Sequence, residues 1–380
     1  MNGFDFHCPT RIVFGPGRFS ELGELTASVG IKRVLVVSDP GIEEVGHTQN
    51  GVESLQAAGL ETLIFDGLAE NPTTDHVDAG VALAKEFQPE GIVAIGGGSS
   101  MDCAKGINFV YSCGGRMQDY WGVGKATAEM LPMVAVPTTA GTGSEAQSFA
   151  LISDAETHVK MACGDKRAAF RVAILDPELT LTQPPRVTAL TGMDAISHAV
   201  ETRVTKKRSA VSIGFSRTAW QLLSSGMELL LDDPERVELR GEVQQGACFA
   251  GLAIESSMLG SAHALANPLT ATYGIAHGEA VSLMLPHVVR RNGKDRAIAE
   301  AYAEMVQTLG EPPSDPVSQL ADYLASLAQR FGLAGKLSDC GVAREELPRL
   351  SAAAAEQWVG TFNPIEMTAN DYLKLYEQAY

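Results

Sequence analysis

Residues 91–105 read GIVAIGGGSSMDCAK, and this stretch decides the fold. The apolar run at residues 91–95 has the composition of a buried strand, and three glycines end it. The residues after the glycines contain no helix breaker, so the stretch predicts a strand, a tight turn and the start of a helix. An apolar strand without polar alternation is typical of a parallel sheet that is covered on both faces.

Comparable apolar runs lie on either side of this strand. They occupy residues 33–39, 62–65, 133–136 and 172–175. Between the runs at 62–65 and 91–95, apolar side chains recur at helical spacing, at Val77, Val81, Ala84 and Phe87. Strands that alternate with helices predict an α/β domain with a parallel, Rossmann-like sheet.

Helical patterns dominate after this region. We expect breaks between helices at Pro184-Pro185, Asp232-Asp233-Pro234, Asn267-Pro268 and Pro312-Pro313. A length of 380 residues also suggests two domains, at roughly 150 residues per domain. We therefore predict a dinucleotide-binding α/β domain at residues 1–180 and an all-α metal-binding and substrate domain at residues 181–380.

The net charge of −17 argues against two classes of partner. A negative field repels the phosphates of nucleic acids and anionic lipid headgroups. No apolar run has the length of a membrane span, and the N-terminus lacks a signal-type segment. The six cysteines form no CxxC pair, which favours free thiols in a reducing compartment. We expect a cytoplasmic protein.

The glycine turn is a candidate phosphate site. Glycines let a backbone approach a pyrophosphate, and the N-terminus of a helix supplies unpaired N–H groups. The candidate cofactor-binding residues here are Gly96, Gly97, Gly98, Ser99 and Asp102. The motif is not GxGxxG, and the alternative is a glycine-rich turn that serves packing alone.

A second loop, PTTAGTGSE at residues 137–145, also follows a predicted strand. Thr138, Thr139 and Thr142 provide hydroxyls that could hydrogen-bond a ribose or a phosphate, although an ordinary Ser/Thr turn has the same composition. Two such loops after parallel strands of one sheet would flank a crevice at the carboxyl ends, where open α/β sheets bind ligands.

Asp39 ends the first of the predicted strands. A carboxylate at this position could accept hydrogen bonds from the adenosine ribose and repel a 2′-phosphate, which favours NAD over NADP. The alternative is a cap of the following turn, because Asp commonly precedes Pro-Gly.

Four side chains suit a metal ion. Asp194 and His198 lie in a stretch without breakers, and residues four apart share a helix face. Such a pair alone also occurs as a cap and a core histidine. His263 and His277 follow on separate predicted elements, so they can approach from different directions. Three imidazoles and one carboxylate suit Fe²⁺ or Zn²⁺.

Four ordered motifs resemble the iron-containing (group III) alcohol dehydrogenase family. They are GGGSSMDCAK at 96–105, PTTAGTGSE at 137–145, TALTGMDAISHAVE at 188–201 and HALANPLTATYGIAHGEAV at 263–281. The resemblance covers essentially the whole chain. It implies an NAD-dependent, metal-containing dehydrogenase that transfers hydride between NAD(H) and a small primary alcohol or aldehyde, with Fe²⁺, sometimes Zn²⁺, and commonly as a homodimer.

The resemblance also implies roles for single residues. Gly97, Gly98 and Ser99 would hold the pyrophosphate, and the three threonines would line the adenosine and phosphate region. Lys160 would reach the nicotinamide side. An aspartate at position 39 is the NAD-favouring feature of the family.

One departure from the family concerns the substrate side. The family usually has a histidine four residues after the third ligand, His263, where this chain has Asn267. Asparagine donates and accepts hydrogen bonds but does not exchange a proton near neutral pH. The candidate catalytic residues are therefore Asn267 and the ligand His277, without the usual proton relay.

Two other functions remain as alternatives. Dehydroquinate synthases share an NAD- and metal-dependent architecture, but their phosphorylated substrate should require basic residues, and none lies between His263 and His277. A protein that kept the fold as a binding module should have lost metal ligands, and all four are present.

Overall fold

The computed structural model describes residues 3–310, 312 and 314–380. These residues divide into two compact units. One unit is His7–Gln183, and the other combines residues 3–6 with Pro184–Tyr380. All six cysteines are free thiols. No helix in the described part of the chain combines the length and the apolar character that a membrane span requires.

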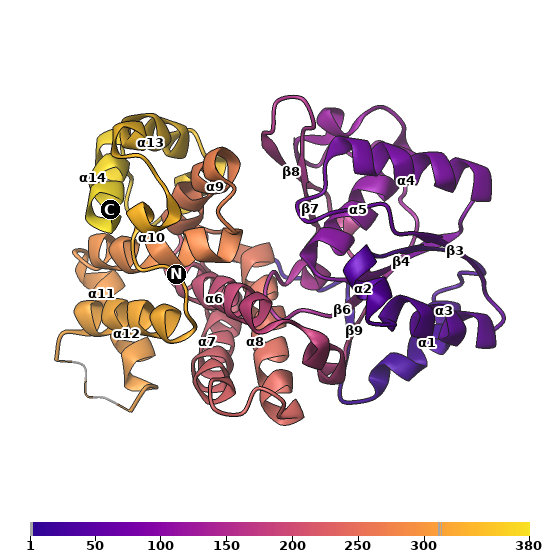
Figure 1. Ribbon diagram of the computed structural model, residues 1–380, viewed down its shortest axis with the longest axis horizontal. Coiled ribbons are helices and arrows are strands. Elements are labelled where there is room, and N and C mark those ends of the chain that lie inside the picture. Colours follow the sequence, from indigo (N-terminus) through magenta and orange to yellow (C-terminus); the bar gives the residue numbers. More distant parts are fainter. Residues whose placement is uncertain (1–2, 311, 313) are drawn as a thin grey trace. The chain divides into compact units, whose positions relative to one another are not determined.

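The first unit is built on a six-stranded sheet in the order β1-β9-β6-β4-β2-β3 (Figure 1), and every pairing in it is parallel. Its strands are β1 (Arg11–Phe14), β2 (Arg33–Val37), β3 (Glu61–Phe65), β4 (Gly91–Gly96), β6 (Met133–Pro137) and β9 (Val172–Leu175). The parallel sheet expected from the five apolar runs is confirmed, and β1 adds an edge strand.

Alternation along the strands divides the core of this unit into two layers. Val34 and Val36 of β2 face one layer, whereas Leu35 and Val37 face the other, and all four are fully buried. The helices that complete this unit are α1 (Leu22–Ser28), α2 (Pro40–Glu44), α3 (His47–Ala57), α4 (Thr74–Phe87) and α5 (Gly98–Cys113). Helices α1 and α3 contribute to the first layer and α4 and α5 to the second, on opposite sides of the sheet in Figure 1. Burial on both faces explains why the strands lack polar residues.

A small second sheet has the order β5-β8-β7. β5 (Gly122–Val123) pairs in parallel with β8 (Lys160–Gly164), which pairs antiparallel with β7 (Phe149–Ser153). These strands escaped the sequence analysis because they contain alanine, serine and glycine rather than a β-branched run. The sheet matters for the site because Lys160 begins β8.

The second unit is helical, as predicted. Its α-helices are α6 (Pro185–Thr202), α7 (Ala210–Leu230), α8 (Val237–Ser257), α9 (Ser261–Tyr273), α10 (His277–Asn292), α11 (Arg296–Gln307), α12 (Pro316–Arg330), α13 (Leu347–Ala355) and α14 (Ala369–Ala379). Asn363 links two helices within this unit. Its Oδ1 accepts hydrogen bonds from Ser261 N (3.3 Å) and Asn292 Nδ2 (3.0 Å), which joins the start of α9 to the end of α10.

The prediction of a break at Asn267-Pro268 is wrong, because α9 continues through Pro268. A proline removes one backbone hydrogen bond of a helix. The buried face of α9 nevertheless runs across it, from Leu265 to Leu269, and tertiary packing holds the helix together. Pro185 begins α6 and Asp232-Asp233-Pro234 separates α7 from α8, as expected. At Pro312-Pro313, Pro313 lies outside the described residues.

Candidate active site

Helix α6 supplies the first two candidate ligands. Pro185 occupies its first position, where a missing N–H costs nothing, and no breaker follows before Thr202. Asp194 and His198 therefore share a face, with His198 Nε2 3.3 Å from Asp194 Oδ1. Both side chains are at least 90% buried, with 8% and 5% of their surface exposed for Asp194 and His198 respectively.

His263 approaches the same carboxylate from α9. Its Nε2 lies 3.5 Å from Asp194 Oδ1, and its ring stacks on that of His198 with centroids 5.0 Å apart. Only 5% of the side chain is exposed. His263 thus adds a second buried imidazole to the pair on α6.

His277 is the first residue of α10 and completes the group. Its Nε2 lies 3.8 Å from Asp194 Oδ1, and its side chain is 25% exposed, the most of the four. The next residue must be glycine, because a Cβ at Gly278 would lie 2.0 Å from the backbone oxygen of Leu190 in α6. This close approach of the two helices brings His277 to Asp194.

Three of these side chains lie close enough together to hold a divalent cation, and His198 lies beside them. Asp194 Oδ1 and His263 Nε2 are buried and have no hydrogen-bond partner, which in native proteins calls for an explanation such as a bound ion. One ligand atom each from Asp194, His263 and His277 lies within 4.8 Å of the others. Burial would raise the pKa of Asp194, but His198, His263 and His277 hold it well below its usual value. A charged carboxylate among three imidazoles is a donor set for Fe²⁺ or Zn²⁺.

The two predicted cofactor loops lie side by side in the first unit. Helix α5 begins at Gly98, with Gly97 as its N-cap. A Cβ at Gly98 would lie 2.6 Å from Thr142 Cγ2, and one at Gly97 would lie 3.3 Å from Thr139 Cγ2. The structure therefore brings glycines and threonines together at a helix N-terminus, an arrangement suited to a phosphate. Thr138 is buried behind them, with only 2% of its surface exposed.

Asp39 lies beside this turn, and its carboxylate accepts two hydrogen bonds. Its Oδ1 accepts from Ile42 N at 3.2 Å, which caps α2, and its Oδ2 accepts from Ser100 Oγ at 3.0 Å. The cap that the sequence left as an alternative is thus present. Each carboxylate oxygen has a further lone pair that can accept another hydrogen bond.

Asp102 points into the unit rather than toward solvent. It is 9% exposed, accepts a 2.7 Å hydrogen bond from Ser144 Oγ, and lies 3.8 Å from the buried ammonium group of Lys105. Burial raises its pKa, and Lys105 and Ser144 oppose that rise. In this arrangement Asp102 ties α5 to the threonine loop.

The loop residue Asn71, which the sequence analysis missed, joins two predicted site residues. Its backbone N–H donates to Ser99 Oγ (3.2 Å), and its Oδ1 accepts from Lys160 Nζ (3.2 Å). Asn71 has a φ of 55°, a conformation that Asn adopts more readily than most residues. A single Asn in a loop carries no periodic signal, so spacing gave no reason to choose it.

Comparison with known proteins identifies the family. Residues 9–177 match the family model for iron-containing alcohol dehydrogenases. Residues 188–380 match the model for the C-terminal region of the Fe-containing alcohol dehydrogenase family. The chain belongs to the iron-containing alcohol dehydrogenase family. It is therefore an NAD-dependent, metal-containing oxidoreductase, which supports the dehydrogenase over the lyase and the binding module.

Three members of the family are similar to this chain over most or all of their length. The NAD-dependent methanol dehydrogenase of Bacillus methanolicus is 33% identical over 380 residues, with 99% of both chains covered. Alcohol dehydrogenase 4 of Schizosaccharomyces pombe is 32% identical over 98% of this chain and 88% of its own. The crystal structure of a 1,3-propanediol oxidoreductase superposes with a TM-score of 0.96 at 31% identity and covers 100% of both chains.

Asn267, where this chain departs from the family pattern, has a definite partner. It lies one turn after His263 on α9, and its Nδ2 donates a 2.9 Å hydrogen bond to Gln357 Oε1. The side chain is partly buried. One of its amide hydrogens is thus committed within the protein, which fixes how the amide is oriented.

Glu201 is a second residue that the sequence analysis did not single out. It lies seven residues after Asp194 on α6, and its Oε2 is 2.6 Å from His263 Nδ1. Burial lowers the pKa of His263, but the carboxylates of Glu201 and Asp194 outweigh it and raise the pKa to about 9. The spacing on one helix face was visible in the sequence, whereas the contact with α9 was not.

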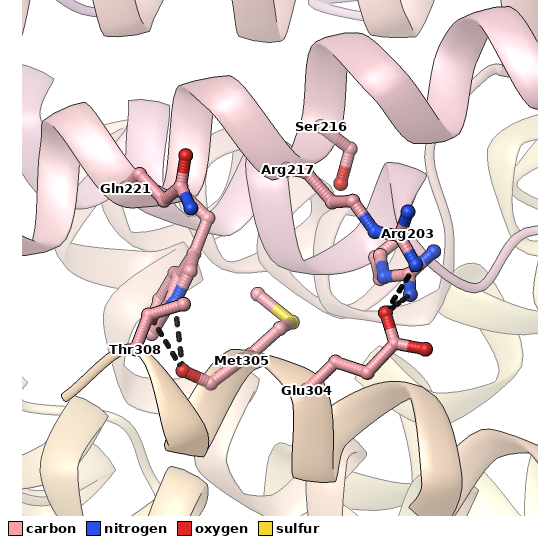
Figure 2. Close-up of a pocket in the computed structure, with 8 residues that line it drawn as sticks. Arg203, Ser216, Arg217, Gln221, Glu304, Met305 and Thr308 are labelled. Carbon is pink, nitrogen blue, oxygen red and sulfur yellow. Dashed lines mark hydrogen bonds and ion pairs between the residues drawn. The ribbon is translucent and has the colours of Figure 1, made fainter. Parts of the chain in front are cut away.

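A pocket of the helical unit contains none of the predicted site residues. It measures about 130 Å³ and is shown in Figure 2. Arg203 and Arg217 both contact Glu304 Oε2 there, and Trp220 Nε1 donates to Thr308 Oγ1 at 2.8 Å. These contacts join α6, α7 and α11, and we interpret the pocket as structural.

Proposed function

We propose that the chain interconverts a small primary alcohol and its aldehyde with NAD⁺ and NADH. The reaction uses one divalent cation, and Fe²⁺ is the ion we propose. The observation that carries the proposal is the convergence of three imidazoles on one buried carboxylate oxygen, at distances of 3.3, 3.5 and 3.8 Å. The relatives named above act, by their names, on methanol, alcohols and 1,3-propanediol, which supports a small substrate.

In this proposal Asp194, His198, His263 and His277 hold the cation. A bound divalent cation supplies Lewis acidity to an alcohol or carbonyl oxygen, and NAD supplies the hydride chemistry. The partial exposure of His277 marks the side from which a substrate can approach, because the other three ligands are closed off. Their burial excludes water, which strengthens every charge interaction at the site.

The first unit would hold the dinucleotide. The N–H groups at the start of α5, around Gly97 and Gly98, are free of intrahelical partners and would donate to the pyrophosphate. Thr139 and Thr142 lie against those glycines and would border the same phosphates. Asp39 would accept from the ribose, and Lys160, held by Asn71, would lie toward the nicotinamide.

On the substrate side we assign Asn267 an orienting role. Its amide is held by Gln357, and it lies one turn from His263. An amide orients a hydroxyl or a water by hydrogen bonding, but it moves no proton near neutral pH. We also propose that the protein acts in the cytoplasm as a homodimer, which light scattering on the purified chain would test for the oligomer.

A substrate screen with a ligand variant tests the proposed function. The wild-type chain should oxidise NADH with short aldehydes in a saturable reaction. Asp194→Asn keeps the shape of the side chain but removes its charge, so it should lose bound metal and turnover while still binding NADH. Wild-type metal content and turnover in Asp194→Asn would refute the proposed site.

A further inference from the structure

The carboxylate of Glu201 makes two short contacts, one with each oxygen. Oε1 accepts a 2.7 Å hydrogen bond from the backbone N–H of Ala262, and Oε2 lies 2.6 Å from His263 Nδ1. A carboxylate only accepts hydrogen bonds, so Nδ1 of His263 must carry the proton. A histidine that binds a metal must be neutral, so its other nitrogen, Nε2, is then bare. This atom lies 3.5 Å from Asp194 Oδ1.

We infer that Glu201 is a positioning residue that fixes the tautomer of His263 and thereby makes Nε2 a metal ligand. The inference rests on the proposed metal site. Partners of this kind commonly fix the ring orientation of a metal-binding histidine and tune its affinity for the ion. Glu201 would act through His263, without touching the cation or the substrate.

The surroundings of Glu201 hold its carboxylate in one orientation. The side chain is 4% exposed, and it follows His198 by one turn of α6, on the face that carries Asp194. A Cβ at Gly260 would lie 2.9 Å from Glu201 Oε1 and 3.1 Å from Asn363 Oδ1, so the space beside the carboxylate is already filled. A side chain at position 260 would therefore displace the carboxylate from its two contacts.

The donor at Ala262 determines what a substitution would do. Ala262 is the second residue of α9, so its backbone N–H has no partner within the helix and needs an acceptor. In Glu201→Gln the amide oxygen must therefore face Ala262, which turns the NH₂ group toward His263 Nδ1. Nδ1 then has to accept, the proton moves to Nε2, and Nε2 is blocked as a ligand.

Glu201→Ala has a different effect on the same histidine. It removes the acceptor but places no donor opposite Nδ1, so the tautomer with a bare Nε2 stays accessible. It also leaves a cavity and an unpaired backbone N–H, which cost stability. The near-isosteric glutamine should thus damage metal binding more than alanine does, although alanine should damage the fold more.

The test measures Zn²⁺ affinity by chelator competition together with the thermal unfolding midpoint. Relative to wild type, Glu201→Ala should weaken Zn²⁺ binding about 10-fold and Glu201→Gln about 100-fold or more. The unfolding midpoints without metal should follow the opposite order, with Glu201→Gln the more stable. The control is Glu228→Gln on α7, which removes the charge that pairs with Arg330 of α12. This variant should leave the Zn²⁺ affinity unchanged.

A second readout reports the tautomer itself. In Zn²⁺-loaded protein labelled with ¹⁵N-histidine, His263 of the wild type should show a protonated Nδ1 and a metal-bound Nε2. Glu201→Gln should show the proton on Nε2. Retention of the Nδ1 proton, or an affinity loss no larger than in Glu201→Ala, would overturn the role of Glu201. Wild-type protein that bound no Zn²⁺ would overturn the proposed metal site as well.

Discussion

At the scale of single residues, Asp39 combines a structural contact with the proposed cofactor role. Asp39→Asn keeps a side-chain acceptor for the N-terminus of α2, because Asn caps helices about as well as Asp. It removes the charge that would repel a 2′-phosphate, an interaction of about 1 kcal/mol or more. The ratio of kcat/KM with NADPH to that with NADH should therefore rise at least about fivefold.

The control for this measurement is Glu44→Gln, which removes an exposed charge from the same helix. Its cofactor ratio should equal that of the wild type. A ratio in Asp39→Asn that also stays at the wild-type value would exclude Asp39 from cofactor selection.

Asn267 gives a prediction about pH dependence. Asn267→His restores the residue usual in the family and introduces a group that titrates near ~6.5. The pH profile of kcat/KM should gain an ionisation in that range, and the wild-type profile should not contain one. A wild-type profile that already contains such an ionisation, and loses it in Asn267→Ala, would mean that Asn267 positions another titrating group.

The sequence predicted the ligand group better than its surroundings. Asp194 and His198 were visible as a pair on one helix face, and His263 and His277 were predicted to lie on separate elements that approach from different directions. The support from Glu201, Asn71 and Gln357 was not predictable, because each acts on a residue from another element. Local periodicity contains no information about such contacts.

At the scale of elements, α11 is held to α6 and α7 by the ion pairs of Glu304 shown in Figure 2. The side chain of Arg203 is only 5% exposed. Burial lowers the pKa of Arg203, and Glu304 counteracts this effect. Glu304→Ala leaves a buried charge without its carboxylate, so it should destabilise the helical unit by roughly 1–3 kcal/mol in denaturant unfolding.

Helix α11 also provides the matched control. Glu300 pairs with Arg296, and the two side chains are 66% and 94% exposed. Exposed pairs contribute little, so Glu300→Ala should change the unfolding free energy by no more than about 0.5 kcal/mol. Equal losses in the two variants would show that burial of Arg203 has no energetic consequence.

The main elements followed from sequence where one physical signal dominated. The stretch at 91–105 formed β4 and the start of α5, and the helical spacing from Val77 to Phe87 corresponds to α4. The hairpin of β7 and β8 and the passage of α9 through Pro268 were missed. In both places tertiary packing overrides a weak or contrary local preference.

At the scale of the whole molecule, acid should weaken the fold through His287. Burial, with a smaller effect of Arg290, lowers the pKa of His287 to about 4. The unfolded chain binds this proton near pH 6.5, so stability is lost as the pH falls from about 6.5 toward 4. His287→Gln should remove roughly 1–3 kcal/mol of that loss.

Unfolding midpoints between pH 7 and pH 4 would measure this effect. The exposed His7 provides a control, since His7→Gln should keep the acid sensitivity of the wild type. If His287→Gln lost stability on acidification as steeply as the wild type, His287 would not be the source.

If the proposed function is correct, turnover depends on one cation held by Asp194, His198, His263 and His277. The most direct test of this dependence titrates the metal-stripped chain with Fe²⁺ under anaerobic conditions while NADH oxidation by a short aldehyde is followed. The rate should rise from near zero and stop increasing at one ion per chain. Full turnover in the stripped chain, or a rate that does not respond to added Fe²⁺, would show that turnover needs no such cation.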